Sequence, residues 1–505
     1  MVPRWSVVLI PGVFFVGACV AAGGLAETPT RTPEMTASPA RARPTITDAP
    51  DVKPDRTRVA VTPTPTALTT IGVEQRELGT EGPWLLLLNG GALYAFNRDG
   101  TGQTKLVEGY VVSLVVAPGG GMVSYIADMD MEDEGAGLEL RLLDLRSRED
   151  ELVTRLQNPQ ALASGEDEEM FGQQFESMRA ISESAPQWSH GGDRIAFIGQ
   201  MDGPSADLYV YSMADEGITR LSDGPSHASG PSWSPDDKYV FHIGVWNFGT
   251  GAGYNNAGSW VARADGSEMY ETTTGPGTDA AMRWMGPHSL LMGSWSQPCG
   301  LGGLRVKDFL SGEETMVWEY ALNDFAYSSE TGQMVIMVPP DMTDCGYEAQ
   351  PTGVFLLNGP TDAPLLISDH DYWSVGVDPS DTSSFLLQEF DGRIDRLLPS
   401  GEIEHVAYTP RGGPMYSEEA DLWAWRSGWG DEVGAWIGPL TDTGPQQIFD
   451  RPVDEGAWSP DGGAYFFVSD DEGYVYMALA PEFKPVLIGT GMGAPVFANL
   501  IWVEQ

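Results

Sequence analysis

The chain has 505 residues, of which 42% are hydrophobic and 10% aromatic, which suffices for a packed core and excludes a wholly disordered protein. Its net charge is −44, and residues 81–505 alone carry 65 acidic against 20 basic side chains. Such a surface repels phosphate backbones and anionic headgroups, so nucleic acid is not expected as a partner, whereas cationic or metal-bridged partners are compatible with it. Solubility, including in a salty medium, would explain the same acidity without any partner.

The N-terminal residues 1–26 have the pattern of an export signal. Arg4 precedes an apolar run over residues 5–18, which is short for a membrane span of about 20 residues. The sequence VGAC that ends at Cys19 resembles a bacterial lipobox, in which the cysteine becomes the lipidated first residue. We therefore expect lipidation at Cys19, with ordinary cleavage after Ala26 as the alternative. The expected location is the cell envelope, on the outer side of the cytoplasmic membrane or at the outer membrane.

Residues 27–70 are rich in threonine and proline. They contain 12 Thr and 8 Pro among 44 positions, and they have too few apolar side chains to form a core. Prolines bias such a segment towards extended polyproline II, at about 3.1 Å per residue. We expect a disordered tether that joins the lipid anchor to a folded domain over residues 71–505.

A repeated module begins near residue 84 and continues to the end of the chain. Its clearest copies are PQWSHGGDRIAFIG from Pro186, PSWSPDDKYVFHIG from Pro231 and GAWSPDGGAYFFVSD from Gly456. Aligned positions in successive copies are 39 to 51 residues apart, which is the length of a four-stranded propeller blade. Weaker copies lie near Val116, Trp284, Tyr327, Val377 and Tyr416.

The repeated Ser-Pro-Asp-Gly sequence favours a type I turn, because proline presets φ and glycine closes the turn. An apolar strand follows each turn, and sheets that are apolar on both faces must stack on neighbours. These repeats resemble the TolB-like propeller family, which implies an all-β propeller of four-stranded blades. We expect seven to nine blades, with eight preferred. The terminal sequence VFANLIWVEQ should close the ring by completing a first blade that begins with three strands in residues 84–107.

The long insertions are expected on one face of the ring. In a blade of strands A to D, the A–B turn lies on one face, and the B–C and D–A connections lie on the other. Nearly all long insertions are of the second kind: residues 129–137, 245–259, 296–303 and 339–353, and the D–A stretch 157–184, with a helix expected near 166–181. We call this the loop-bearing face, and we expect the binding site there because elaborated loops on a rigid scaffold carry function.

Aromatic and amide side chains occur in these loops. Exposed aromatic rings beside amides suit sugar stacking or a protein-binding hot spot, although the same rings can instead tuck under their own loops. The candidate binding residues are Trp246, Phe248, Tyr254, Asn255, Trp295, Tyr347 and Trp429.

Two cysteines lie 46 residues apart, one repeat length, in B–C loops of adjacent blades. Equivalent positions in adjacent blades are neighbours, so we expect a disulfide between Cys299 and Cys345, with two unpaired thiols as the alternative.

An acidic loop in the first full repeat has alternating carboxylates and a glycine. Asp128, Asp130 and Asp133 resemble part of a calcium loop, but the downstream glutamate is missing at the required spacing. An acidic surface loop is the alternative, and no other cofactor is expected.

These patterns favour a non-catalytic binding or scaffolding propeller that recognises an envelope protein or an extracellular glycan. The sequence contains no Gly-x-Ser-x-Gly nucleophile elbow of the kind that hydrolases attached to related propellers carry. The alternative is a propeller enzyme of the lyase or glycosidase type acting on an extracellular polymer, which needs convergent carboxylates or a metal.

Overall fold

A computed structural model describes most of the repeat region. The described residues all belong to one compact unit, which includes Thr69–Gln505. They are residues 76–107, 109–128, 137–157, 176–248, 254–274, 279–296, 300–338, 350–410, 414–428, 432–441, 444–470, 473–490 and 499–504.

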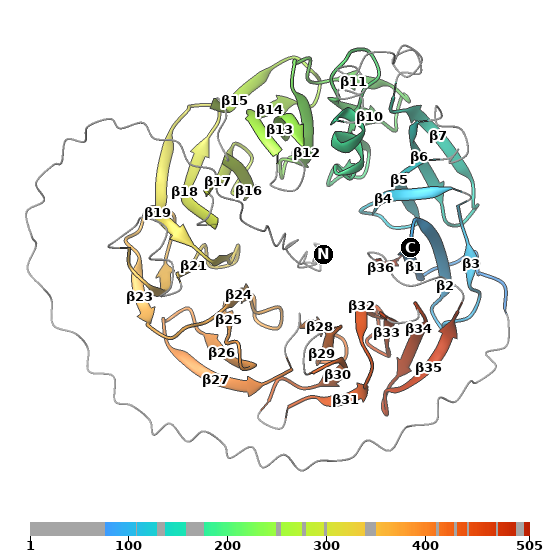
Figure 1. The fold of residues 1–505 in the computed structure, drawn as a ribbon, viewed down its shortest axis with the longest axis vertical. Helices are drawn as coiled ribbons and strands as arrows, with labels where there is room; N and C mark the ends of the chain where they lie inside the picture. Colours follow the sequence, from blue (N-terminus) through green and yellow to red (C-terminus); the bar gives the residue numbers. More distant parts are fainter. Residues whose placement is uncertain are drawn as a thin grey trace, which may run out of the picture. The chain divides into compact units, whose positions relative to one another are not determined.

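The described residues form nine four-stranded antiparallel sheets arranged in a ring as the blades of a propeller (Figure 1). Strand A of each blade lies nearest the ring axis and strand D lies outside (Figure 1). In the order A to D, blade 1 contains β36 (Asn499–Val503), β1 (Trp84–Asn89), β2 (Ala92–Asn97) and β3 (Thr104–Lys105); blade 2 contains β4 (Tyr110–Val116), β5 (Met122–Asp128), β6 (Leu138–Asp144) and β7 (Asp150–Arg155); blade 3 contains β8 (Gln187–Trp188), β9 (Arg194–Gly199), β10 (Asp207–Ser212) and β11 (Ile218–Arg220).

The remaining blades follow in chain order. Blade 4 contains β12 (His227–Trp233), β13 (Tyr239–Phe248), β14 (Tyr254–Arg263) and β15 (Met269–Thr274); blade 5 contains β16 (Asp279–Trp284), β17 (Ser289–Ser296), β18 (Gly300–Asp308) and β19 (Glu314–Leu322); blade 6 contains β20 (Asp324–Tyr327), β21 (Met334–Val338), β22 (Gly353–Leu357) and β23 (Leu365–Ser368). Blade 7 contains β24 (Ser374–Val377), β25 (Phe385–Gln388), β26 (Arg393–Leu397) and β27 (Ile403–Tyr408); blade 8 contains β28 (Met415–Ser417), β29 (Leu422–Ser427), β30 (Gly434–Gly438) and β31 (Gln446–Phe449); blade 9 contains β32 (Val453–Trp458), β33 (Ala464–Ser469), β34 (Val475–Leu479) and β35 (Lys484–Gly489).

The ring closes through the last strand, as the sequence predicts. β36 pairs antiparallel with β1, with Trp84 opposite Val503 and Leu88 opposite Asn499. The all-β propeller is thereby confirmed. Its nine blades are the upper end of the expected range and one more than the preferred eight, because each of the weak repeat copies supplies a complete blade of its own.

The core lies between blades. On β1, Leu86 packs with Tyr125 of blade 2, whereas the preceding residue Leu85 points to the other face and packs with Phe466 of blade 9. All four side chains are fully buried. Each buried side chain of this size stabilises the fold by about 1.5–3 kcal/mol, so much of the stability depends on neighbouring blades.

The tryptophan of the repeat links strand A of one blade to the blade before it. The indole N–H of Trp233 donates to the carbonyl of Gln187, 2.8 Å away, and that of Trp188 donates to the carbonyl of Val115, 3.2 Å away. Trp458 makes the equivalent bond to Met415 at 3.2 Å. A buried indole N–H needs such an acceptor, which explains why the repeat places tryptophan here.

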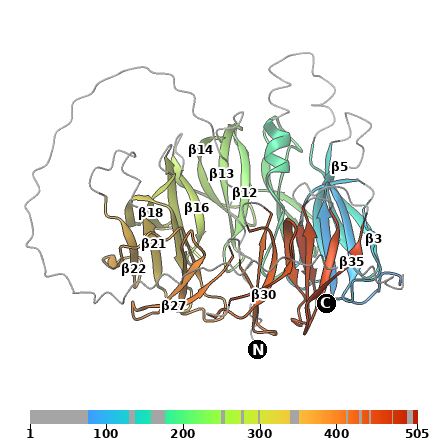
Figure 2. The same cartoon turned by 60° about the horizontal axis from the view of Figure 1, so that its bottom comes forward.

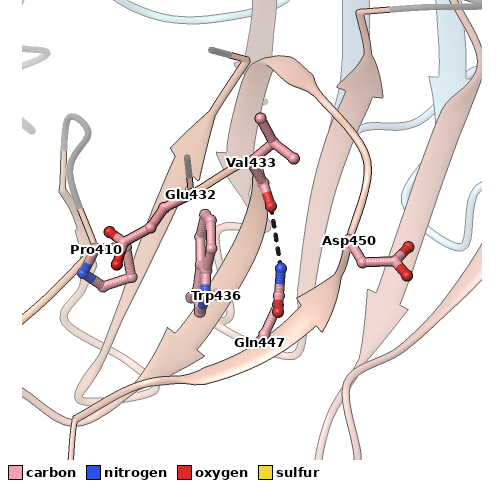
Figure 3. A pocket seen from close by; sticks show the side chains of 6 residues that line it. All are labelled: Pro410, Glu432, Val433, Trp436, Gln447 and Asp450. Carbon is pink, nitrogen blue, oxygen red and sulfur yellow. Dashed lines mark hydrogen bonds between the residues drawn. The ribbon is translucent and has the colours of Figure 1, made fainter. Parts of the chain in front are cut away.

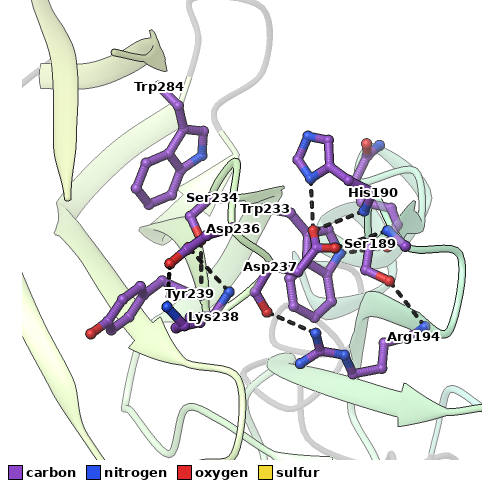
Figure 4. A network of polar contacts seen from close by, with 12 residues as sticks. Ser189, His190, Arg194, Trp233, Ser234, Asp236, Asp237, Lys238, Tyr239 and Trp284 are labelled. Atoms are coloured by element: carbon purple, nitrogen blue, oxygen red, sulfur yellow. Dashed lines mark hydrogen bonds and ion pairs between the residues drawn. The ribbon is translucent and has the colours of Figure 1, made fainter. Parts of the chain in front are cut away.

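The A–B turns also bind across blades, as between blades 3 and 4 (Figure 4). The carboxylate of Asp237 accepts hydrogen bonds from the backbone N–H groups of His190 and Gly191, both at 2.8 Å, and lies 2.7 Å from Nδ1 of His190. Arg194 donates to the carbonyl of Asp237 at 2.8 Å, and its guanidinium lies over the Trp233 ring. The turn of blade 4 is thus fixed by groups of blade 3.

We expect Asp237→Asn to lower the free energy of unfolding by about 1–2 kcal/mol, because the amide can accept with only one oxygen where the carboxylate accepts with two. Asparagine tolerates the positive φ of 56° at this position, so the backbone should not add to the effect. Urea unfolding of the full chain measures the change. Glu149→Gln, an exposed position on a C–D turn, is the matched loss of one charge and should change stability by less than about 0.5 kcal/mol. Equal stability of the two variants would contradict the role assigned to Asp237.

Candidate functional site

The loop-bearing face contains a short helix and an extended hairpin. The described part of the 157–184 insertion includes a helix over residues 176–182, which overlaps the end of the helix expected near 166–181. Strands β13 and β14 are each ten residues long and form the B–C hairpin of blade 4. The helix and this hairpin project on the same side of the ring (Figure 2). We call them the helix–hairpin site.

The end of the hairpin presents an indole beside two amides. Trp246 is 49% exposed, and Asn247 and Asn255 are exposed next to it. Asn247 and Asn255 face each other in register, and Nδ2 of Asn255 donates to Oδ1 of Asn247 at 2.8 Å. This bond orients both amides and leaves the other N–H of Asn255 Nδ2 directed away from Asn247.

The helix holds the hairpin from the side. The backbone N–H of Phe248 donates to Oε2 of Glu176 at 2.5 Å, and Arg179 donates to the carbonyl of Phe248 at 2.8 Å. The Arg179 guanidinium also lies 5.3 Å from the centre of the Phe248 ring and forms an ion pair with Glu183 at 2.6 Å. Because Ala180 is buried in the core below, these contacts tie the last residue of β13 to the ring.

The sequence-predicted binding residues are placed as follows. Trp246 and Asn255 are exposed, but Phe248 is only 3% exposed and holds the hairpin instead of facing solvent. Tyr254 begins β14, and Trp295 lies in β17. Several predicted positions fall outside the described residues: Cys19, Asp130, Asp133, Cys299, Tyr347, Cys345 and Trp429, together with the signal segment and the tether.

Neither metal binding nor a membrane span is found in the part of the chain that the structure describes. Asp128 is the last residue of β5, and the described residues contain no group of three or more histidine, cysteine, aspartate or glutamate side chains placed to hold a metal ion. Within the same residues, no helix has the length and apolar character to cross a bilayer.

A groove of about 590 Å³ separates the outer parts of blades 3 and 4. The His242 ring stacks on the indole of Trp260 with their centres 5.8 Å apart, and both residues line the groove. Gly244 is required behind this pair, because a Cβ there would lie 2.5 Å from the indole. Sequence reasoning missed the groove, since its walls come from two different blades.

Burial lowers the pKa of His242 to about 4, so the imidazole is neutral at pH 7. Nδ1 of this ring has no hydrogen-bond partner among the described residues. A neutral, buried imidazole with an unpaired nitrogen costs free energy in the folded protein, and its protonation would cost more.

A second group of titratable side chains, in blade 7, was also not expected. Asp395 is fully buried and accepts hydrogen bonds from Arg393 at 2.8 Å and from Tyr372 at 2.6 Å, and its carboxylate lies 2.9 Å from Nδ1 of His405. Burial and then the bond to Asp395 raise the pKa of Tyr372. Because Asp395 is surrounded by its own partners, the cluster fits a structural role in joining strands rather than acid–base chemistry.

The comparisons with known proteins bear on the fold of this chain and not on its activity. No family model matches the chain. A curated relative, the uncharacterized peptidase YuxL of Bacillus subtilis (strain 168), is 38% identical over 55 residues, which are 11% of this chain and 8% of the relative's length.

Similar solved structures include TolB from Acinetobacter baumannii, with 11% identity, a TM-score of 0.29 and coverage of 57% of this chain and 65% of that one. AztD from Citrobacter koseri has 12% identity, a TM-score of 0.42 and coverage of 83% of this chain and 98% of that one. An oligogalacturonate lyase in complex with manganese has 15% identity, a TM-score of 0.36 and coverage of 60% of this chain and 89% of that one. Likenesses this distant assign no activity to the chain, whose propeller fold is established by its own nine sheets.

The depressed pKa of His242 predicts a specific loss of stability in acid. The unfolded chain binds a proton at this histidine below about pH 6.5, whereas the folded chain does so only below about pH 4, so stability falls through that window as the pH falls. Between pH 7 and pH 4.5, the full chain should lose about 2–3 kcal/mol more than a His242→Gln variant. Urea unfolding at both pH values measures this difference, and His370→Gln, which changes an exposed histidine, should behave as the unaltered protein does. Equal acid sensitivity of the His242→Gln variant and the unaltered chain would contradict the assignment.

Proposed function

We propose that this chain is an exported, lipid-anchored, non-catalytic propeller that binds an extracellular glycan through the helix–hairpin site. The observation that carries the proposal is the exposed indole of Trp246 beside the paired amides of Asn247 and Asn255. An aromatic ring covers the apolar C–H face of a sugar, and amides beside it bond to the hydroxyls at the rim.

A glycan fits this surface better than a protein partner does. Among the neighbouring side chains that the structure describes, the exposed indole has the polar Asn247 and Asn255 rather than a continuous apolar patch, whereas protein interfaces bury about 1,200–2,000 Å² around a desolvated apolar centre. The net charge of −44 disfavours polyanionic polysaccharides, so the expected ligand is a neutral glycan.

The fixed geometry of the site supports binding. Glu176 and Arg179 hold both backbone groups of Phe248, two residues from Trp246. Because these contacts already fix the end of β13, residues 246–248 lose little conformational entropy when a ligand binds.

The export and lipidation parts of the proposal rest on the sequence alone. The apolar run over residues 5–18 and Cys19 support a lipoprotein precursor, and the Thr/Pro-rich residues 27–70 support a tether on the order of 100 Å between anchor and propeller.

The test is titration of the full chain with cellohexaose, xylohexaose, mannohexaose and chitohexaose, followed by thermal unfolding and calorimetry. At least one of these neutral oligosaccharides should raise the melting temperature, because a ligand of the folded state stabilises it. Trp246→Ala should weaken that binding by about 1.5–3 kcal/mol, and Trp246→Phe should weaken it less.

Phe390→Ala is the matched control, since it removes an exposed aromatic side chain from blade 7 and should leave glycan affinity unchanged. Unaltered affinity of Trp246→Ala would reject the site. Failure of every oligosaccharide together with a protein partner whose binding requires Trp246 would replace the glycan with a protein, and release of shorter products would make the chain an enzyme.

A further inference from the structure

The groove of about 590 Å³ between blades 3 and 4 has two walls of different chemistry, and we call it the blade 3–4 groove. The wall from blade 4 includes His242, Gly244, Trp260 and Met269, which are mostly aromatic or apolar. The wall from blade 3 and the linker that follows it is formed by residues 220–226, whose sequence RLSDGPS is mostly polar. A ligand that fills the groove therefore needs one apolar side and one polar side.

The indole of Trp260 lies beside a serine hydroxyl from the opposite wall. Gly244 marks the place where they meet, because a Cβ there would lie 2.5 Å from Cζ3 of Trp260 and 2.9 Å from Oγ of Ser226. Trp260 is only half-buried, although it stands in the middle of a sheet. Among the described residues, no hydrogen bond involves Oγ of Ser226, so this hydroxyl is available to a ligand.

An imidazole lies against the same indole. The rings of His242 and Trp260 are stacked, with their centres 5.8 Å and their planes 24° apart. His242 is 3% exposed and lines the groove, and its Nδ1 has no hydrogen-bond partner among the described residues. Buried polar atoms of proteins are nearly always hydrogen-bonded, to the protein or to a bound molecule. The blade 4 wall thus has a hydrogen-bonding group that the described part of the chain does not use.

The charged groups of the groove are already paired within the protein. Arg220, the only lysine or arginine among the lining residues, forms ion pairs with Asp207 at 2.6 Å and with Asp223 at 2.8 Å. The carboxylate of Glu268 lies 3.6 Å from the guanidinium of Arg263. A charged ligand therefore finds no uncompensated partner of opposite sign, whereas carboxylate oxygens in such pairs keep lone pairs that can accept from hydroxyl groups.

The two walls meet at one end of the groove. Gly266, in the C–D turn of blade 4, has a φ of 74°, and a Cβ there would lie 3.1 Å from Cγ2 of Thr219 and 3.4 Å from the carbonyl oxygen of Arg220. This contact of the turn with β11 limits the length of the groove and therefore of its ligand.

A smaller cavity of about 320 Å³ in blade 8 lacks such an arrangement (Figure 3). There Trp436 stands between Glu432 and Gln447, and the carboxylates of Glu432 and Asp450 lie on opposite sides of the indole. The polar groups of that cavity do not converge on one ligand.

We propose that the blade 3–4 groove binds a short neutral saccharide of one or two sugar residues. A pyranose ring has an apolar C–H face, which an indole can cover, and hydroxyls at its edge, which polar side chains can bind. These two sides match the two walls of the groove. A flat aromatic ligand would match the indole, but it would leave the polar wall of residues 220–226 without partners. The volume lies within the range of about 300–1,000 Å³ that small-ligand sites have.

This inference goes beyond the proposed function and does not rest on it. The groove shares no residue with the contacts that define the helix–hairpin site, so either site can exist without the other. The experiment therefore uses the full chain with Trp246→Ala, in which the proposed helix–hairpin site is disabled and the remaining binding reports on the groove.

The test is calorimetric titration of this protein with cellobiose, xylobiose, mannobiose and N,N′-diacetylchitobiose. At least one of these neutral disaccharides should bind saturably at one site, with a dissociation constant of about 0.1–10 mM. Sorbitol has the hydroxyls of a sugar but no ring face to cover the indole, so it should bind at least about tenfold more weakly.

Two further substitutions locate the binding. Adding Trp260→Ala should weaken it by about tenfold or more, and Trp260→Phe should weaken it less because a smaller ring face remains. Ser226→Ala removes one hydroxyl beside the indole and should weaken binding by about two- to tenfold. Ser226 lies in a linker and its Oγ makes no bond within the described chain, so this variant should fold normally and decides the test if Trp260→Ala does not fold.

Matched controls lie in blade 7. Phe390→Ala removes an exposed aromatic side chain and Ser400→Ala removes an exposed serine hydroxyl, and both should bind the disaccharide as the parent protein does. Melting temperatures of all variants show which of them fold.

Four outcomes would overturn the proposal: no saturable binding of any of the four disaccharides, equal binding of sorbitol, unchanged affinity in folded Trp260→Ala, and unchanged affinity in Ser226→Ala. Binding to the unaltered chain that disappears entirely with Trp246→Ala would support the helix–hairpin site and reject the groove. Binding that survives Trp246→Ala and is lost with Trp260→Ala would support the groove, whatever the fate of the helix–hairpin site.

Discussion

Every blade of this protein is apolar on both faces, and the rest of the structure depends on that constraint. Adjacent residues of β1 show it directly, since Leu85 packs towards blade 9 and Leu86 towards blade 2. A sheet of this kind cannot end at an edge that meets water without exposing one of its faces. The pairing of β36 with β1 removes that edge by joining the two ends of the repeat region in one blade.

The two faces of the closed ring differ in what their loops do. On the face of the A–B turns, blades are joined by specific polar contacts such as those of Asp237 with His190 and Gly191. A turn that is bound to its neighbour in this way has little room to change. On the other face, insertions such as the β13–β14 hairpin and the 176–182 helix extend from this rigid scaffold.

The repeat predicted the fold well because its signal is periodic and local: a turn, an apolar strand and a spacing of one blade. The candidate site was harder to predict, because the exposure of its side chains depends on the register of the strand pairing. In β13 the pairing shifts between Val245 and Asn247, so that Trp246 and Asn247 are both exposed where simple alternation would bury one of them. Phe248 then turns inward against Arg179, a contact between residues 69 positions apart.

The distribution of charge connects the fold with ligand preference. Several of the few basic residues are used inside blades, as in the pairs Arg220–Asp207 and Arg393–Asp395. The chain has 72 acidic against 28 basic residues, and the resulting negative potential concentrates cations near the surface. That potential decays within about 8 Å at physiological ionic strength, so it cannot distinguish one cation from another.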